Sequence, residues 1–319
     1  MKSIILGTRG SALALAQTDM VERALRAVFP ELEIERKVIK TTGDSRTDIP
    51  LSEVARAADL DKGVFTKELE VALEGGEIDL AVHSLKDMPS TLDEGFLIAA
   101  VLPRVSRQDV LIAKKPGGLQ GLRKGAQIAT SSVRRQRLLR SLRPDLEVVD
   151  IRGNVPTRIR KLHESSEMEG ILLAKAGLWR LGLLRDDGMV ESGGATCFAE
   201  ELDETVFVPA AGQGAVALEI RSGDQGSLAA CEAVNHADTM RIVAAERSFL
   251  ALLGAGCETP VGVAGEVEEV VGPGGIRLRA VVFEDEDNTP LRGEVLGPGN
   301  DPNGLATRLL AAMKNLEAS

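Results

Sequence analysis

Apolar, strand-like runs alternate with helical patterns along most of the chain, and several of these runs end in charged residues. The stretch "IDLAVHSLKDMPS" (78–90) begins like a buried parallel strand and then places Lys86 and Asp87 side by side. Alternating strands and helices form open α/β sheets, in which ligands lie beyond the carboxyl ends of the strands. The pattern therefore predicts an α/β protein whose ligand-binding edge includes Lys86 and Asp87.

The order of the expected elements indicates three domains. A βαβαβ pattern covers residues 1–102, with Ser11 as the expected N-cap of its first helix, and a second α/β unit covers residues 103–202. The stretch "VFVPAAGQGAVALEIR" has the composition of strand material returning to the first unit, so residues 203–221 are assigned there. After this point strands and helices follow in a different order, which predicts a small α+β domain over residues 222–319.

Composition and charge disfavour several kinds of partner. The chain has 319 residues, a formal net charge of −10, and 3% aromatic residues with no tyrosine, which argues against a nucleic-acid partner. It lacks an apolar run of membrane-spanning length and a secretory leader, and its three cysteines have no zinc-site spacing. We therefore expect a cytoplasmic protein with no metal site, no nucleic-acid partner and no membrane partner.

Basic residues recur where expected strands end and helices begin. Residues 123–161 contain eleven Lys or Arg and three Asp or Glu, in a chain that is acidic as a whole. A charge run is usually a solvated face, but cations at strand ends can converge on one cleft and bind several carboxylates or phosphates. The residues in such positions are Arg9, Ser11, Ser132, Arg134, Arg135, Arg152 and Arg158.

Cys257 differs from the other two cysteines in its surroundings. It lies in the turn "LGAGCETPVG", where small residues leave space around the sulfur, which suits an anchor or a nucleophile. No histidine lies beside it to form a Cys–His pair. We expect Cys197 and Cys231 to be inert core residues, and His83 to be structural.

Seven segments, taken in order, resemble the hydroxymethylbilane synthase (porphobilinogen deaminase) family across nearly the whole chain. They are "TRGSALALAQ", "DKGVFTKELE", "DLAVHSLKDMPS", "TSSVRRQ", "IRGNVPTR", "PAAGQGAVALE" and "LGAGCETPVG". The resemblance implies two domains built like periplasmic binding proteins, a third small domain, and an active cleft between the first two. It also implies a transferase that joins four porphobilinogen molecules head to tail with loss of ammonia, and a monomer.

The resemblance also implies roles for individual residues. A dipyrromethane cofactor would be bound through a thioether to Cys257, and Asp87 would be the catalytic carboxylate. The expected cofactor-binding residues are Cys257, Ser11, Lys86, Asp87, Ser132, Arg134 and Arg135, and the expected substrate-binding residues are Arg9, Lys62, Arg152 and Arg158. The chain departs from the family pattern at Ala12, Ala58 and Ala255 and in "DLDKG". The departures at Ala58 and in "DLDKG" fall in the loop around Lys62.

A different class of function uses the same cations. A two-domain anion-binding protein without catalysis would also place arginines at strand ends, but it would have no need for Cys257 or Asp87. A covalently held dipyrromethane adds mass that this alternative does not predict.

Overall fold

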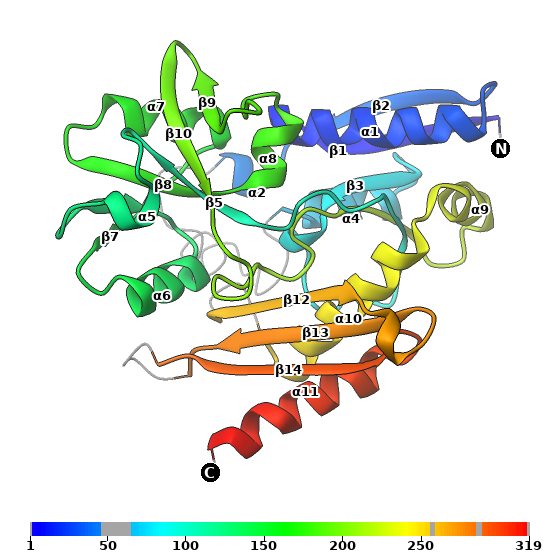
Figure 1. Cartoon of the computed structure of the whole chain (residues 1–319). Helices are drawn as coiled ribbons and strands as arrows, with labels where there is room; N and C mark the ends of the chain where they lie inside the picture. The colour runs from blue at the N-terminus through cyan, green and yellow to red at the C-terminus, as the bar shows by residue number, and fades with distance from the viewer. Residues whose placement is uncertain (1, 46–64, 256–258, 285–288, 318–319) are drawn as a thin grey trace.

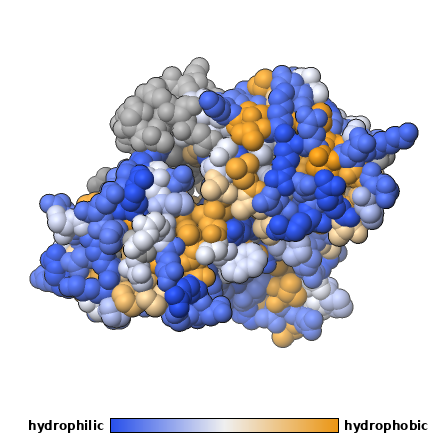
Figure 2. All heavy atoms as spheres, turned by 90° about the horizontal axis from the view of Figure 1, so that it is seen from above, coloured by the Kyte–Doolittle hydropathy of each residue, from blue (hydrophilic) through white to orange (hydrophobic). Residues whose placement is uncertain are grey.

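The computed structural model describes residues 2–45, 65–255, 259–284 and 289–317, and its strands form three sheets (Figure 1). Lys62 and Cys257 lie outside the described residues. Within these ranges, no helix is both long and apolar enough to cross a lipid bilayer. The face seen from above in Figure 2 is largely hydrophilic, and its apolar residues lie in patches between polar ones.

The first sheet has the strand order β2-β1-β3-β11-β4. Its strands are β1 (Ser3–Arg9), β2 (Glu33–Ile39), β3 (Leu80–Ser84), β4 (Phe96–Val101) and β11 (Val216–Arg221). β1, β2 and β3 run parallel, whereas β11 returns from much later in the chain and pairs antiparallel with β3 and β4. The carboxyl ends of β1 and β3 are therefore neighbours, which brings the residues after each strand to one edge.

Helices cover both faces of the first sheet. They are α1 (Ala12–Val28), α4 (Lys67–Glu74) and α9 (Gln225–Val234), with the short α2 (Thr42–Ser45) and the 3-10 turn η1 (Leu85–Asp87) at the sheet's edge. α1 and α9 bury their apolar residues against one face, and α4 covers the other with Leu69 and Leu73. α9 thus packs on the first sheet although it follows residue 222, where we expect the third domain to begin.

The second sheet has the order β7-β6-β8-β5-β10-β9, in which β6, β7 and β8 are parallel. Its strands are β5 (Asp109–Ala113), β6 (Gln127–Ala129), β7 (Glu147–Val149), β8 (Met168–Ala174), β9 (Met189–Ser192) and β10 (Ala195–Glu201). Its helices are α5 (Gly118–Gly121), α6 (Val133–Leu142), α7 (Val155–Glu164) and α8 (Lys175–Arg180). Gly193 and Gly194 both have positive φ, which a tight hairpin between β9 and β10 requires.

The third sheet is small and antiparallel, with β13 (Gly275–Val282) between β12 (Val261–Val267) and β14 (Leu291–Pro298). The 3-10 turn η2 (Glu269–Val271) joins its first two strands, and α10 (Ala237–Leu252) and α11 (Pro302–Glu317) pack on it around a shared apolar core. Two α/β units followed by a small α+β unit confirm the fold class that the sequence predicts. The exact domain boundaries stay a prediction.

The chain crosses between the first two sheets twice, through residues 102–108 and 202–215. We predict strand material for the whole of "VFVPAAGQGAVALEIR", but only its last six residues form a strand. The earlier part turns instead, because Pro209 lacks an N–H and Gly212 and Gly214 adopt positive φ. At Gly214 the two crossing segments touch, since a Cβ there would lie 2.7 Å from the carbonyl oxygen of Ser106.

A single buried carboxylate connects both crossing segments to the third sheet. Glu246 of α10 is fully buried and forms a two-pronged ion pair with Arg104, at 2.6 and 3.2 Å. The same carboxylate accepts hydrogen bonds from the backbone N–H of Gly212 (2.7 Å) and of Gly265 (2.8 Å). All its contacts are charge-assisted and lie in the interior, where losing the charge is costly.

Replacement of Glu246 with Gln should therefore destabilise the protein strongly, because it leaves Arg104 buried without its counter-charge. We expect a loss of about 3–5 kcal/mol, seen as a lower midpoint of urea unfolding. The matched control is Glu164→Gln, which removes a carboxylate that is largely exposed and 3.9 Å from Arg160. This control should change stability by less than about 0.5 kcal/mol. Equal midpoints for the two variants would contradict the connecting role of Glu246.

Candidate active site

The carboxyl edge of the first sheet presents residues from β1 and β3 side by side. Arg9 ends β1 and its guanidinium lies 4.1 Å from the centre of the Phe65 ring. Ser11 caps α1 by accepting a hydrogen bond from the N–H of Ala14 at 3.2 Å, as expected for an N-cap. Lys86 and Asp87 stand in the 3-10 turn that follows β3.

Buried Leu85 anchors that turn. Its side chain is 2% exposed and packs where a Cβ on Gly212 would clash at 2.7 Å, so the second crossing segment lies directly against it. The N–H of Met88 bonds the carbonyl of Leu85 and closes the turn. Because Leu85 points inward, the turn holds Lys86 and Asp87 toward the outside of the sheet's edge, where Asp87 is half-buried.

The second sheet presents its cations in the same way, at the carboxyl ends of β6 and β7. Ser132 caps α6 by accepting from the N–H of Arg135, and Asn154 caps α7 by accepting from the N–H of Thr157. Arg152 lies just before α7, and Arg158 donates from Nε to the carbonyl of Gly153 at 2.7 Å. The expected helix starts near 132 and 155 are confirmed.

Asp109, at the start of β5, holds two of the predicted arginines together. It is fully buried and pairs with Arg134 at 2.7 Å and with Arg135 at 2.6 Å, while the Gln213 amide donates to it at 3.0 Å. Burial alone would raise the pKa of Asp109, but the charges of the two arginines outweigh it and hold that pKa well below its ordinary value. The carboxylate therefore stays ionised inside the protein.

The two arginines differ in what remains available to a ligand. Arg135 uses Nε, Nη1 and Nη2, because it also donates to the carbonyl of Leu172 and to Gln213. Arg134 uses only Nη1, for Asp109 and for the carbonyl of Val208. A direct contact to ligand carboxylates is thus easier for Arg134, and the cofactor-binding role of both residues stays a prediction.

Electrostatic coupling indicates that the two edges lie near each other. Loss of surrounding water lowers the pKa of Lys86 to about 8, although the nearby Asp87 carboxylate raises it, and Arg135 of the other sheet also lowers it. Burial lowers the pKa of Arg158 to about 10, with Arg135 and Arg152 acting in the same direction and Asp87 against them. Asp87 and Lys86 from one sheet therefore lie within electrostatic reach of the arginines of the other.

Lys86 is reachable by water although protein surrounds it. This combination is typical of a side chain that lines a cleft rather than one packed in a core. α1 and α8 meet beside the cleft, where a Cβ on Gly177 would lie 3.7 Å from the Leu13 side chain (Figure 1). The described residues thus bring more cations than anions together between the two edges, with Asp87 among them, and the cleft that they would line stays a prediction.

Comparisons with known proteins match nearly the whole chain. The family model "Porphobilinogen deaminase, dipyromethane cofactor binding domain" matches residues 4–229, and "Porphobilinogen deaminase, C-terminal domain" matches residues 240–315. The chain belongs to the porphobilinogen deaminase family. Porphobilinogen deaminase of Syntrophomonas wolfei is 46% identical over 84% of this chain and 82% of its own length. That of Thermus thermophilus is 41% identical over 97% and 94%.

Two solved structures of other proteins are similar at a low level. The methionine-binding protein MetQ is 12% identical with a TM-score of 0.43, and covers 77% of this chain and 95% of its own. The Bordetella pertussis BvgS VFT2 domain is 12% identical with a TM-score of 0.42, over 73% and 86%. Similarity of this degree says nothing about function, and the fold described above rests on the strand order and register.

One buried cation of this porphobilinogen deaminase family member, beside the second crossing segment, is missing from the sequence predictions. Arg180 ends α8, and its Nη2 donates to the carbonyl of Gly214 at 2.8 Å. Its Nε is buried and has no hydrogen-bond acceptor among the described residues, and burial lowers its pKa to about 10. Its position in the fold is the signal that could have indicated Arg180, because β8 is parallel to β6, ends at the same edge and is followed by α8. A buried cation in this state suits a ligand carboxylate.

Replacement of Asp109 with Asn should produce a pH-dependent loss of stability. Because the folded-state pKa of Asp109 lies below its ordinary value of 3.8, its contribution is present above that pH and is lost as the pH falls further. At pH 7 we expect the variant to be less stable by about 3–5 kcal/mol, with the difference shrinking below about pH 4. Urea midpoints from pH 3 to 7 measure this. Exposed Asp186→Asn should show little difference at any pH, and a pH-independent deficit in Asp109→Asn would refute the linkage.

Proposed function

We propose that this chain is a hydroxymethylbilane synthase, a transferase that joins four porphobilinogen molecules head to tail, releases ammonia at each step, and then releases linear hydroxymethylbilane. One observation carries the proposal beyond family membership: cations from two sheets lie within electrostatic reach of one another and of Asp87. The substrate has acetate and propionate side chains, so each added unit brings two carboxylates. A growing chain of such units needs several cations along one cleft.

The described residues fit the dipyrromethane group named in the family description. Burial lowers the pKa of Lys86, Arg158 and Arg180, and Arg180 also has a buried Nε without a described acceptor. Carboxylates of a bound pyrrole pair would supply negative charge to these cations and a hydrogen-bond acceptor to the Nε of Arg180. The holders would be Ser11, Lys86, Asp87, Ser132, Arg134, Arg135 and, by attachment, Cys257. When bound, this group supplies the pyrrole end to which substrate units are added.

Substrate binding falls to the remaining cations. Arg9, Arg152 and Arg158 would bind the acetate and propionate of an incoming molecule, and we add Arg180 to this set. Lys62, which lies outside the described residues, remains an expected substrate-binding residue. Guanidinium groups suit this role because each can contact a carboxylate through two parallel N–H donors. Ligand carboxylates would also return the pKa values of these cations toward their ordinary range.

The condensation also requires a carboxylate near the reacting atoms, and we assign this role to Asp87. Each condensation breaks the bond between the methylene carbon and the departing nitrogen and forms a bond from that methylene to a pyrrole carbon. A proton must then leave the pyrrole carbon that has formed this new bond. A carboxylate near the pyrrole N–H groups can stabilise positive charge during bond breaking and accept this proton. Lys86 and Arg158 beside it would hold the substrate in register.

The non-catalytic alternative receives less support. A simple anion-binding protein would use the same arginines, but it gives no reason for a carboxylate among them, since Asp87 would repel the ligand's own carboxylates. The curated relatives with similar sequences are named porphobilinogen deaminase. A monomeric, cytoplasmic enzyme remains our expectation from the sequence.

Replacement of Cys257 with Ala tests the cofactor attachment. The described cysteines are poor candidates, because both are buried and burial raises the pKa of the Cys197 and Cys231 thiols. Cys257→Ala should fold, lack the covalent adduct by intact mass, and be inactive. The control Cys231→Ala should keep the adduct. An adduct of unchanged mass on Cys257→Ala would rule out the assignment.

Replacement of Asp87 with Asn tests the catalytic role. Asn has nearly the same size but cannot hold the charge or accept the proton, so turnover should fall at least ~100-fold at matched cofactor loading. KM should change much less, because the binding cations are unaffected. Exposed Asp93→Asn, in the loop after the turn, is the matched control and should be fully active. Near-normal turnover by Asp87→Asn, measured as ammonia release, would end the proposal for Asp87.

A further inference from the structure

An open cavity of about 670 Å³ lies away from the cleft, where the end of α6, the second crossing segment and the start of β14 meet. We call it the α6–β14 cavity. Its lining includes Arg140 and Arg292, the hydroxyl groups of Ser141 and Thr205, and the apolar side chains of Leu142 and Val206. None of the described residues that line it is acidic, in a protein whose formal net charge is −10.

Arg292 is held only by neutral groups. Its Nη1 donates to the carbonyl of Thr205 at 3.3 Å and its Nη2 to the carbonyl of Val206 at 2.8 Å. A guanidinium has five N–H donors, so Nε–H and one N–H on each terminal nitrogen remain. Burial lowers its pKa, and no carboxylate contributes in the opposite direction. Arg140 is exposed at the other side of the cavity, and no carboxylate of the described residues pairs with it.

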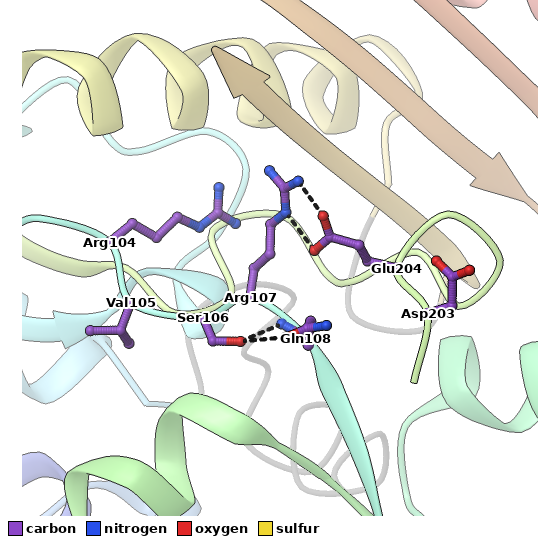
Figure 3. Close-up of a pocket in the computed structure, with 7 residues that line it drawn as sticks. All are labelled: Arg104, Val105, Ser106, Arg107, Gln108, Asp203 and Glu204. Carbon is purple, nitrogen blue, oxygen red and sulfur yellow. Dashed lines mark hydrogen bonds and ion pairs between the residues drawn. The ribbon is translucent and has the colours of Figure 1, made fainter. Parts of the chain in front are cut away.

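A second cavity, between the crossing segments, shows the contrasting arrangement (Figure 3). There Arg107 pairs with Glu204 at 2.5 Å and with Glu266 at 3.1 Å, and Arg104 pairs with Glu246 at 2.6 Å. Both arginines of that cavity therefore have protein carboxylates as partners. Among the described residues, the arginines of this second cavity have carboxylate partners, whereas those of the α6–β14 cavity have none.

Arg292 shares its electrostatic state with a cleft residue. Arg180 and Arg292 each have a pKa that burial lowers without any opposing carboxylate, and each donates to backbone carbonyls only. Under the proposed function, we expect a ligand carboxylate at Arg180. The same reasoning applied to the α6–β14 cavity indicates a ligand that carries negative charge.

The apolar part of the lining narrows the class of ligand. Leu142 is 37% exposed and Val206 38% exposed, and both line the cavity, so apolar surface there is in contact with water. An apolar body placed against them would remove this surface from water. We propose that the α6–β14 cavity binds a small organic dicarboxylate, whose two carboxylates contact Arg140 and Arg292 and whose apolar body covers Leu142 and Val206.

The test uses the cofactor-loaded enzyme and phthalate, which joins two carboxylates to an apolar ring. Crystals soaked with 4-bromophthalate locate the site directly, because the bromine gives an anomalous signal. We expect a bromine peak in the α6–β14 cavity of the wild type, in addition to any peak in the cleft. Calorimetry at constant ionic strength then measures affinity, with inorganic phosphate as the probe that lacks an apolar body.

Two variants keep the test decisive. Arg292→Gln removes a residue that also donates to the crossing segment, whereas Arg140→Gln removes only a charge. Each should weaken phthalate binding at this cavity about tenfold, as expected for one lost charge-assisted contact. Both should leave turnover of porphobilinogen unchanged. Arg26→Gln, which makes the same charge change at an exposed site on α1, is the matched control and should bind like the wild type.

The bromine peak and the affinities decide whether the α6–β14 cavity binds a dicarboxylate. A bromine peak in the cavity that disappears in Arg140→Gln and Arg292→Gln supports the proposal. A bromine peak confined to the cleft, or unchanged affinity in Arg140→Gln, overturns it. Phosphate binding as tight as that of phthalate at this cavity overturns the organic part of the assignment.

Discussion

The ionised carboxylate of Asp109 is the constraint on which the cleft depends. It sits where the first crossing segment becomes β5, and it gathers Arg134 and Arg135 from α6 and Gln213 from the second crossing segment. Two arginines placed side by side in the interior would repel each other without it. The start of α6, the joint between the sheets and the cation-rich wall of the cleft therefore share one point of attachment.

Around that point, the two sheets place few carboxylates among several cations. Asp109 pairs with both Arg134 and Arg135, and Asp87 lies within electrostatic reach of Lys86 and Arg158. Burial lowers the pKa of Lys86, Arg158 and Arg180, because water solvates their charges poorly. If these cations hold a ligand rich in carboxylates, as we propose, its affinity depends on keeping protein carboxylates other than Asp87 away from them.

The sequence allowed much of the fold and part of the site to be predicted, for identifiable physical reasons. Apolar runs and caps are local signals, so the edges carrying Arg9, Lys86 and Arg152, and the caps Ser11 and Ser132, could be placed from them. Asp109 and Arg180 could not, because their importance arises from which strands become neighbours and from where the crossing segments pass. The 206–215 stretch was wrongly predicted as strand, because alternation of apolar residues does not reveal the turns that glycine permits. The roles of Asp87 and Cys257 came from family resemblance rather than from local pattern.

The contact at Gly214 leaves no space between the two segments that join the first two units. A Cβ there would lie 2.8 and 2.7 Å from the carbonyl oxygens of Val105 and Ser106, and the positive φ of this residue is one that glycine adopts without strain. A single added carbon at this position would therefore act as a wedge between the two segments. It would alter how the two units are joined even though no residue of the candidate site itself had changed.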